Sequence, residues 1–159
     1  MTTSSEFSIK SQQTRHAIMC AIICEDNDGQ HKILVYSACS RENKTVNTLL
    51  TSMGECSDEA EGKVMVSGFL KTILGVQVNL DDKPYFDLPS LTDRVNTYGE
   101  IVIPVSPDIT VPEGYSFIPL SSAHAVLTYP PMKEAALNAC RHLDVEPIIY
   151  TRKFNRDIK

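Results

Sequence analysis

The sequence predicts a mixed α/β domain, and three observations lead to this prediction. Residues 17–24 (AIMCAIIC) are apolar at every position, which is typical of a strand covered on both faces. Residues 58–74 place apolar side chains at helical spacing and stop before Gly75. Shorter strand patterns and a last helix follow without a repeated strand–helix alternation, so a doubly wound parallel sheet is not expected.

Length and composition are those of one ordinary domain. The chain has 159 residues, of which 42% are hydrophobic, enough for a real core. We expect residues 1–14 to be a flexible N-terminal lead-in and residues 15–159 to form a single domain. No apolar run is long enough for a membrane span and no secretory signal is visible, so the expected location is cytoplasmic. Five cysteines without a C-x-x-C pair favour neither disulfides nor zinc.

The first strand is expected to form a hairpin with the next apolar segment. Asp28 and Gly29 are a turn signal between residues 17–24 and residues 31–38 (HKILVYSA). A polar loop follows at 40–45, and the next few residues predict only a turn or a short strand. The first strand should therefore lie centrally in the sheet.

The long helix has signals at both ends. Ser57 and Asp58 are good N-caps, and Asp58 with Glu61 has capping-box spacing. Its predicted apolar face must be buried, and is broad enough to suit a homodimer interface; it consists of Met65, Val66, Phe69, Leu70, Ile73 and Leu74. After Gly75, apolar residues alternate with polar ones, which predicts a strand leaving the helix.

The second half predicts strands and then a helix. Strands are expected near 85–88, 100–105 and 115–120, a helical turn at 121–127, and a final helix that opens at Pro130-Pro131.

Laid on these elements, the sequence resembles the Nudix superfamily. The family signature is G-x5-E-x7-R-E-U-x-E-E-x-G-U, where U is aliphatic. Its two glycines and two of its aliphatic positions are matched without a gap, by Gly54, Leu70, Gly75 and Val76. The resemblance covers residues 15–143 and implies a mixed sheet sandwiched by helices.

The resemblance implies a hydrolase metal site that this chain lacks. Family glutamates hold a divalent cation on the substrate diphosphate, and an arginine orients one of them. The corresponding positions here are Ala60, Gly68, Phe69, Thr72 and Ile73. Phenylalanine and isoleucine offer no oxygen to a hard cation. The sequence therefore predicts a degenerate Nudix box and no cofactor.

An acidic cluster precedes and opens the helix, at Glu55, Asp58, Glu59 and Glu61. These carboxylates are a candidate metal or ligand loop, since they could bind Mg²⁺ or Mn²⁺ in a way that differs from the family. The alternative is that they face water and favour the helix dipole.

A second candidate set could line a cleft, namely Tyr36, Arg41, Phe117 and His124. The aromatic residues could stack on bases, or they could pack on the sheet. His124 could be a general base, or it could cap a turn.

Two functions remain open at this point, beside the alternative of a different small α/β fold in which the helix at 58–74 is only part of the core. The first is a non-catalytic binding module for a nucleotide-derived ligand or a protein partner, with a homodimer as one expectation. The second is a divergent hydrolase of nucleoside diphosphate-linked substrates that recruits the acidic cluster. A formal charge of −5 makes nucleic acid a less favoured partner.

Overall fold

The computed structural model describes residues 15–52, 56–93 and 95–149, and the chain divides into two compact units. Unit 1 comprises Met1–Cys20 and Thr51–Ile101, and unit 2 comprises Ala21–Leu50 and Val102–Lys159. The predicted lead-in lies outside the described residues. The prediction of a single domain stays a prediction.

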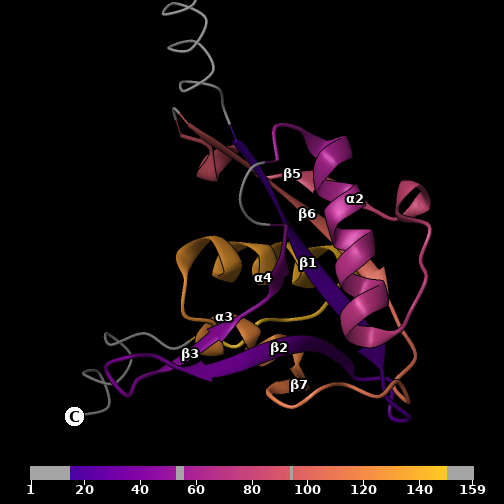
Figure 1. The fold of residues 1–159 in the computed structure, drawn as a ribbon. Helices are drawn as coiled ribbons and strands as arrows, with labels where there is room; N and C mark the ends of the chain where they lie inside the picture. Colours follow the sequence, from indigo (N-terminus) through magenta and orange to yellow (C-terminus); the bar gives the residue numbers. More distant parts are fainter. Residues whose placement is uncertain (1–14, 53–55, 94, 150–159) are drawn as a thin grey trace, which may run out of the picture. The chain divides into compact units, whose positions relative to one another are not determined.

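Strands β1 (Arg15–Glu25) and β6 (Asn96–Pro104) each run from one unit into the other. Hydrogen bonding orders the strands β3-β2-β1-β6-β5, with β4 (Leu50–Thr51) beside β1 and β7 (Tyr115–Pro119) beside β2. All residues of β1 from Ile18 to Cys24 are buried, so the predicted central strand is confirmed. The combination of this sheet with helices confirms the α/β class (Figure 1).

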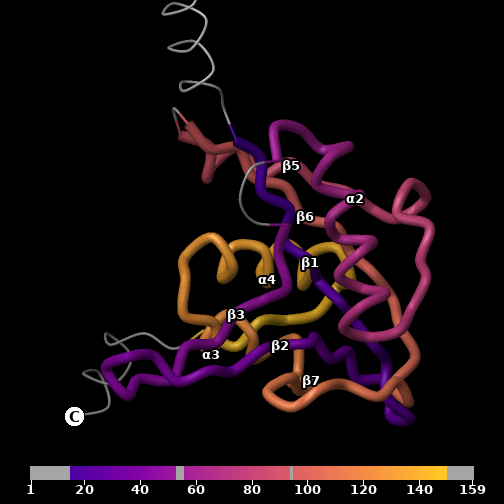
Figure 2. Tube along the Cα trace, viewed as in Figure 1, coloured from indigo at the N-terminus to yellow at the C-terminus, as the bar shows by residue number. Residues whose placement is uncertain are grey.

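Unit 1 is built around the long helix, which has two parts. The α-helix α2 (Glu59–Phe69) continues directly into η1 (Leu70–Leu74), a π-helical turn, and Gly75 then takes a left-handed conformation at φ 68°. The predicted start and stop are therefore confirmed. The chain path through this helix, magenta in Figure 2, leads on to the short helix η2 (Leu80–Asp82) and to β5 (Tyr85–Asp87). A further short helix, η3 (Pro89–Leu91), precedes β6.

The buried stripe of the helix is narrower than the sequence predicts. It recurs every four residues, at Gly62, Val66, Leu70 and Leu74. Residues four apart make slightly more than one turn of an α-helix of 3.6 residues per turn, so their side chains move gradually around the helix axis. The wider π turn rotates the next side chain back, so that Leu74 stays on the buried side. The prediction of one fully buried apolar face is wrong for Met65, which is 36% exposed, and Phe69 and Ile73 are only half-buried.

The predicted strand after Gly75 is also wrong. Residues 75–79 have no regular secondary structure, although Val76 and Val78 are more buried than Gln77 and Asn79. The Val76 N–H donates instead to the Leu70 carbonyl at 3.3 Å and closes the helix end, and the Asn79 side chain caps η2. The alternation of apolar and polar residues at 76–79 thus means that one side of this segment is covered by the protein, although the segment pairs with no neighbouring strand.

Helix α2 approaches the sheet of unit 1 very closely at Gly62. The Ser52 hydroxyl accepts a hydrogen bond from the Ile18 N–H at 2.8 Å, while the Ser52 N–H donates to the Ile18 carbonyl at 2.9 Å. A Cβ added at Gly62 would lie 2.7 Å from Ile18 Cδ1 and 3.3 Å from Ser52 Oγ. A side chain fits at this contact only if the buried Ile18 side chain shifts.

Unit 2 is centred on β2 (His31–Cys39). The predicted hairpin is confirmed by the antiparallel pairs from Ile23↔Ile33 to Glu25↔His31. Tyr36 pairs with Thr48 of β3 (Thr45–Thr48) and with Tyr115 of β7, so β3 and β7 lie on opposite edges of β2. Helix α3 (Leu120–Val126) follows β7 without a loop and contacts α4 (Pro130–Leu143), which buries Ala135, Ala136, Ala139 and Cys140. The predicted final helix is confirmed.

Two glycine substitutions in α2 should shift stability in opposite directions. Gly62→Ala forces a methyl group against Ile18, and overpacking of about 1–3 kcal/mol should outweigh the gain in helix propensity. Gly68→Ala meets nothing within 4 Å, so it should stabilise the chain by about 0.5–1 kcal/mol. Urea denaturation measures both free energies of unfolding. A Gly62→Ala variant at least as stable as the wild type would contradict the close approach.

Candidate binding site

The acidic residues at the start of α2 are used by the helix itself. Asp58 is the N-cap, and its Oδ1 accepts a hydrogen bond from the Glu61 N–H at 2.9 Å. Glu61 Oε2 in turn accepts from the Ser57 N–H at 2.9 Å. The predicted Asp58 cap is therefore confirmed, and it satisfies the Glu61 N–H, which the helix start otherwise leaves unpaired. Glu61 reaches back past the N-cap to Ser57, so the arrangement is a variant of the predicted capping box, in which the N3 side chain accepts from the N-cap N–H.

Glu59 is held by a lysine one turn further along. Its carboxylate lies 2.8 Å from Lys63 Nζ, and the same ammonium lies 4.0 Å from Asp81 and 5.3 Å from the centroid of the Tyr85 ring. The Lys63 side chain is only 16% exposed. Lys63 therefore ties α2 to η2 and β5 by charge and by a cation–π contact.

The candidate metal loop is thus brought together only in part. Asp58, Glu59 and Glu61 share the first turn of α2, while Glu55 lies outside the described residues. Within the described ranges, no three side chains of His, Cys, Asp or Glu gather in a group that could hold a metal ion.

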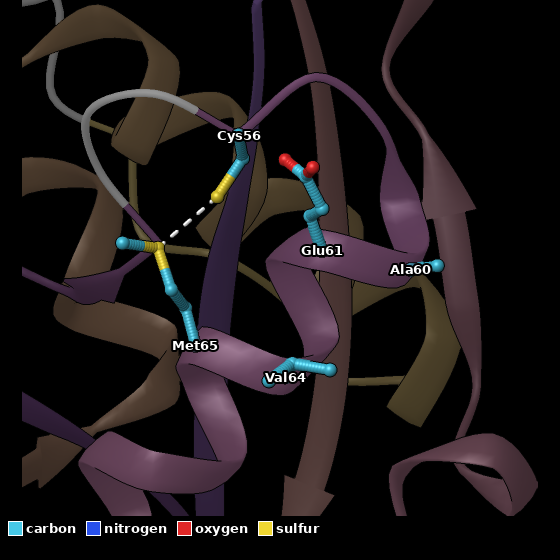
Figure 3. A pocket seen from close by; sticks show the side chains of 5 residues that line it. All are labelled: Cys56, Ala60, Glu61, Val64 and Met65. Atoms are coloured by element: carbon cyan, nitrogen blue, oxygen red, sulfur yellow. Dashed lines mark hydrogen bonds between the residues drawn. The ribbon is translucent and has the colours of Figure 1, made fainter.

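The outer face of α2 carries a pocket of about 450 Å³, which we call the Cys56 pocket. Its lining is mostly apolar and consists of Cys56, Ala60, Glu61, Val64 and Met65. Figure 3 shows Met65 reaching from α2 toward the buried Cys56, and their sulfur atoms lie 3.1 Å apart. A weak S–H···S contact therefore closes one end of the pocket.

A second pocket of about 370 Å³, the Asp81 pocket, lies along the same helix. It is lined by Ala60, Lys63, Val64, Ser67, Val78, Asn79, Leu80 and Asp81. Ala60 and Val64 line both pockets, one helical turn apart, so they form an apolar ridge between them. Val64 is 74% exposed, the most exposed large hydrophobic side chain among the described residues.

This ridge is not among the features predicted from the sequence, although the sequence indicates that one apolar side chain of α2 faces outward. Three consecutive apolar residues, 64–66, cover about 200° of a helix, so they cannot all face one core. With Val66 buried against the sheet, Val64 must point outward.

A buried polar chain joins three strands in unit 1. His16 Nδ1 lies 2.6 Å from Thr97 Oγ1, and the Thr97 hydroxyl donates to the Arg15 carbonyl at 3.4 Å. His16 Nδ1 is therefore the donor to Thr97, and Nε2 accepts from the Tyr85 hydroxyl. Burial, with the nearby carboxylates of Glu59 and Asp87, raises the pKa of Tyr85 well above its usual value. These hydrogen bonds join β1, β5 and β6 within unit 1.

The candidate cleft residues all lie in unit 2. Tyr36 is 37% exposed and packs on Tyr115 with ring centroids 4.8 Å apart, and Phe117 lies two residues along β7 on the same side. Arg41 is exposed in the loop after β2. The His124 carbonyl accepts from Lys133 Nζ at 2.7 Å. Tyr36 and Phe117 are therefore close, while no contact joins them to Arg41 or to the His124 ring among the described residues.

Known structures resemble this chain over most of its length. The C-terminal domain of mouse MUTYH, solved in complex with human PCNA, matches with a TM-score of 0.61 at 12% identity, over 87% of this chain and 96% of that one. A Nudix hydrolase from M. smegmatis, RenU, matches with a TM-score of 0.58 at 8% identity, over 85% and 90%. The NUDIX domain of Shewanella oneidensis NrtR, solved with ADP ribose, matches with a TM-score of 0.55 at 11% identity, over 90% and 99%.

No protein-family model and no curated protein matches the sequence. The structural likeness shows that this chain has the Nudix fold. None of the helices in the described part of the chain is long and apolar enough to cross a membrane.

Replacing Tyr85 should change how stability depends on pH. Because its pKa is raised in the folded state, the folded chain keeps this proton above about pH 10, where the unfolded chain loses it, so its contribution to stability falls as the pH rises further. Tyr85→Phe should cost about 1–3 kcal/mol at neutral pH, because His16 Nε2 loses its donor, and should then lose less stability above about pH 10.

Denaturation from pH 7 to alkaline pH measures this difference. Tyr129→Phe, at an exposed side chain in unit 2, is the matched control and should keep the wild-type stability at neutral pH. An equal alkaline decline in the wild type and in Tyr85→Phe would contradict the assignment.

Proposed function

We propose that this Nudix-fold chain is a non-catalytic binding module, and that its ligand is a protein partner held on the outer face of α2. The observation that carries the proposal is the exposed ridge of Ala60 and Val64 between two pockets. An exposed apolar ridge with a hollow on each side suits a protein interface, where an apolar side chain of the partner can be buried in a hollow.

The residues at the signature positions do not fit a divalent cation. Gly68 and Phe69 end α2, and Thr72 and Ile73 lie in η1. Of these four side chains, only that of Thr72 offers an oxygen, whereas Mg²⁺ and Mn²⁺ need carboxylates and water in octahedral geometry. Asp58, Glu59 and Glu61 are engaged by helix N–H groups or by Lys63. These contacts support a binding role over hydrolysis.

The charges of the two pockets favour a protein over a nucleotide-derived ligand. A diphosphate in the Cys56 pocket would face Glu61, and one in the Asp81 pocket would face Asp81. Among the described lining residues of the two pockets, the one cation is Lys63, and it is already paired with Glu59 at 2.8 Å. An isolated anion would therefore meet mainly like charge. The mouse MUTYH domain shows that a protein of similar fold can be solved with a protein partner.

We expect no metal-dependent hydrolysis of nucleoside diphosphate-linked compounds, because the described residues form no cation site that could neutralise the charge developing on the phosphate. The assay uses the purified chain with Mg²⁺ or Mn²⁺ and follows release of nucleotide products from ADP-ribose. Turnover that depends on metal and is lost in Glu59→Gln or Glu61→Gln would instead favour the divergent hydrolase. Glu55→Gln tests the remaining member of the acidic cluster.

Val64→Gln should weaken partner binding at least about tenfold and leave the fold intact. The substitution removes the apolar ridge from a largely exposed position, so stability should change by less than about 0.5 kcal/mol. Peptides are selected from a random-peptide phage library on the wild-type chain, synthesised, and titrated by fluorescence anisotropy. We expect Val64→Gln to weaken their binding by about tenfold or more.

Val95→Gln is the matched control, since Val95 is 50% exposed in the same unit and lines neither pocket. It should bind as the wild type does. Failure to select any saturable binder, or equal binding by Val64→Gln, would overturn the proposal. The expected homodimer remains a prediction, and sedimentation equilibrium of both variants checks whether the same ridge mediates it.

A further inference from the structure

The surroundings of the apolar ridge are acidic. Residues 56–83, all described, carry five carboxylates and three lysines: Asp58, Glu59, Glu61, Asp81 and Asp82, with Lys63, Lys71 and Lys83. Lys63 is largely buried and paired with Glu59, and Lys83 is paired with Asp82, each at 2.8 Å. The face that surrounds the ridge is therefore negative, and it complements a partner that is positive at its edge.

The Cys56 pocket suits an apolar side chain. Among its described lining residues, Cys56, Ala60, Val64 and Met65 present carbon and sulfur. Glu61, which also lines it, directs Oε2 to the Ser57 N–H. Met65 and Cys56 offer a polarizable, adaptable wall of the kind that accepts aliphatic and aromatic anchors.

The Asp81 pocket suits a long cationic side chain. Val64 and Val78 supply apolar walls along which the methylene stem of lysine or arginine can lie. The Asp81 side chain is 89% exposed, and its contact with Lys63 is 4.0 Å long, while Lys63 holds Glu59 at 2.8 Å. Asp81 thus keeps most of its capacity to accept a cation from outside.

Resting on the binding function proposed above, we infer the chemistry of the partner. The outer face of α2 binds a protein segment that places an apolar side chain in the Cys56 pocket and a lysine or arginine in the Asp81 pocket. The two side chains straddle the ridge of Ala60 and Val64. Apolar burial supplies most of the affinity, while the cation fixes orientation and selects the partner.

The test uses the peptides selected on the wild-type chain. We expect them to combine an aliphatic or aromatic residue with a lysine or arginine at a constant separation, and to bind less tightly as salt rises to about 0.5 M. Asp81→Lys should weaken their binding by about tenfold, since it sets like charge against the cation. Asp87→Lys, at an exposed position of β5 that lines neither pocket, is the matched control and should have little effect.

The outcomes separate this inference from the proposed function. Peptides that depend on Val64 but carry no cation, or that bind Asp81→Lys and the wild type equally, overturn the inference and leave the binding function standing. Peptides that ignore Val64→Gln overturn both. A charge-reversed peptide, with glutamate in place of its lysine or arginine, should bind the wild type at least tenfold more weakly and should recover on Asp81→Lys.

Discussion

The close approach of α2 to β1 at Gly62 is the constraint on which the rest of unit 1 depends. Because Gly62 has no side chain, the helix backbone can lie against Ile18 and Ser52, and the residues four apart from it, Val66, Leu70 and Leu74, follow onto the buried side. Because these residues form the buried face of α2, the residues on the opposite side of the helix are the ones that face solvent. Ala60 and Val64 are then left in solvent, between two hollows that the neighbouring segments complete.

At the start of α2, hydrogen bonds and an ion pair within the fold engage a cluster of carboxylates. A helix start leaves N–H groups without partners and carries partial positive charge. Asp58 accepts a hydrogen bond from the Glu61 N–H, and the Glu61 carboxylate accepts one from the Ser57 N–H just before the helix. Glu59 holds Lys63 in the position from which it also faces Asp81 and the Tyr85 ring. The same residues that suggest a metal loop in the sequence therefore stabilise the helix and its neighbours. The negative field that they leave around the ridge bears on the choice of partner.

The Nudix fold sets an expectation that the side chains of this helix do not meet. Where the family signature has an arginine and three glutamates, this chain has Gly68, Phe69, Thr72 and Ile73, and the two apolar ones are half-buried. A fold fixes where a site can be built, but the chemistry depends on the groups placed there. In this chain the signature positions carry packing groups in place of ligand oxygens, and the exposed apolar surface of the same helix supports the binding role proposed above.

The sequence by itself determined the elements whose signals are local. The wholly apolar strand at 17–24, the turn at Asp28-Gly29, the cap at Asp58, the stop at Gly75 and the final helix after Pro130 each follow from backbone preferences and side-chain spacing within a few residues. Tertiary structure decided what those signals cannot contain. Which arc of α2 is buried depends on where β1 allows the backbone to approach, so the exposure of Val64 and Met65 follows from Ile18, more than forty residues away. The alternation at 76–78 predicts a strand, yet a strand also needs a neighbour with free hydrogen-bonding groups, and the helix end takes the Val76 N–H first. The Asp81 pocket likewise depends on tertiary structure, because residues 78–81 must fold back against α2 to form its wall, and the local pattern of neither segment shows that contact.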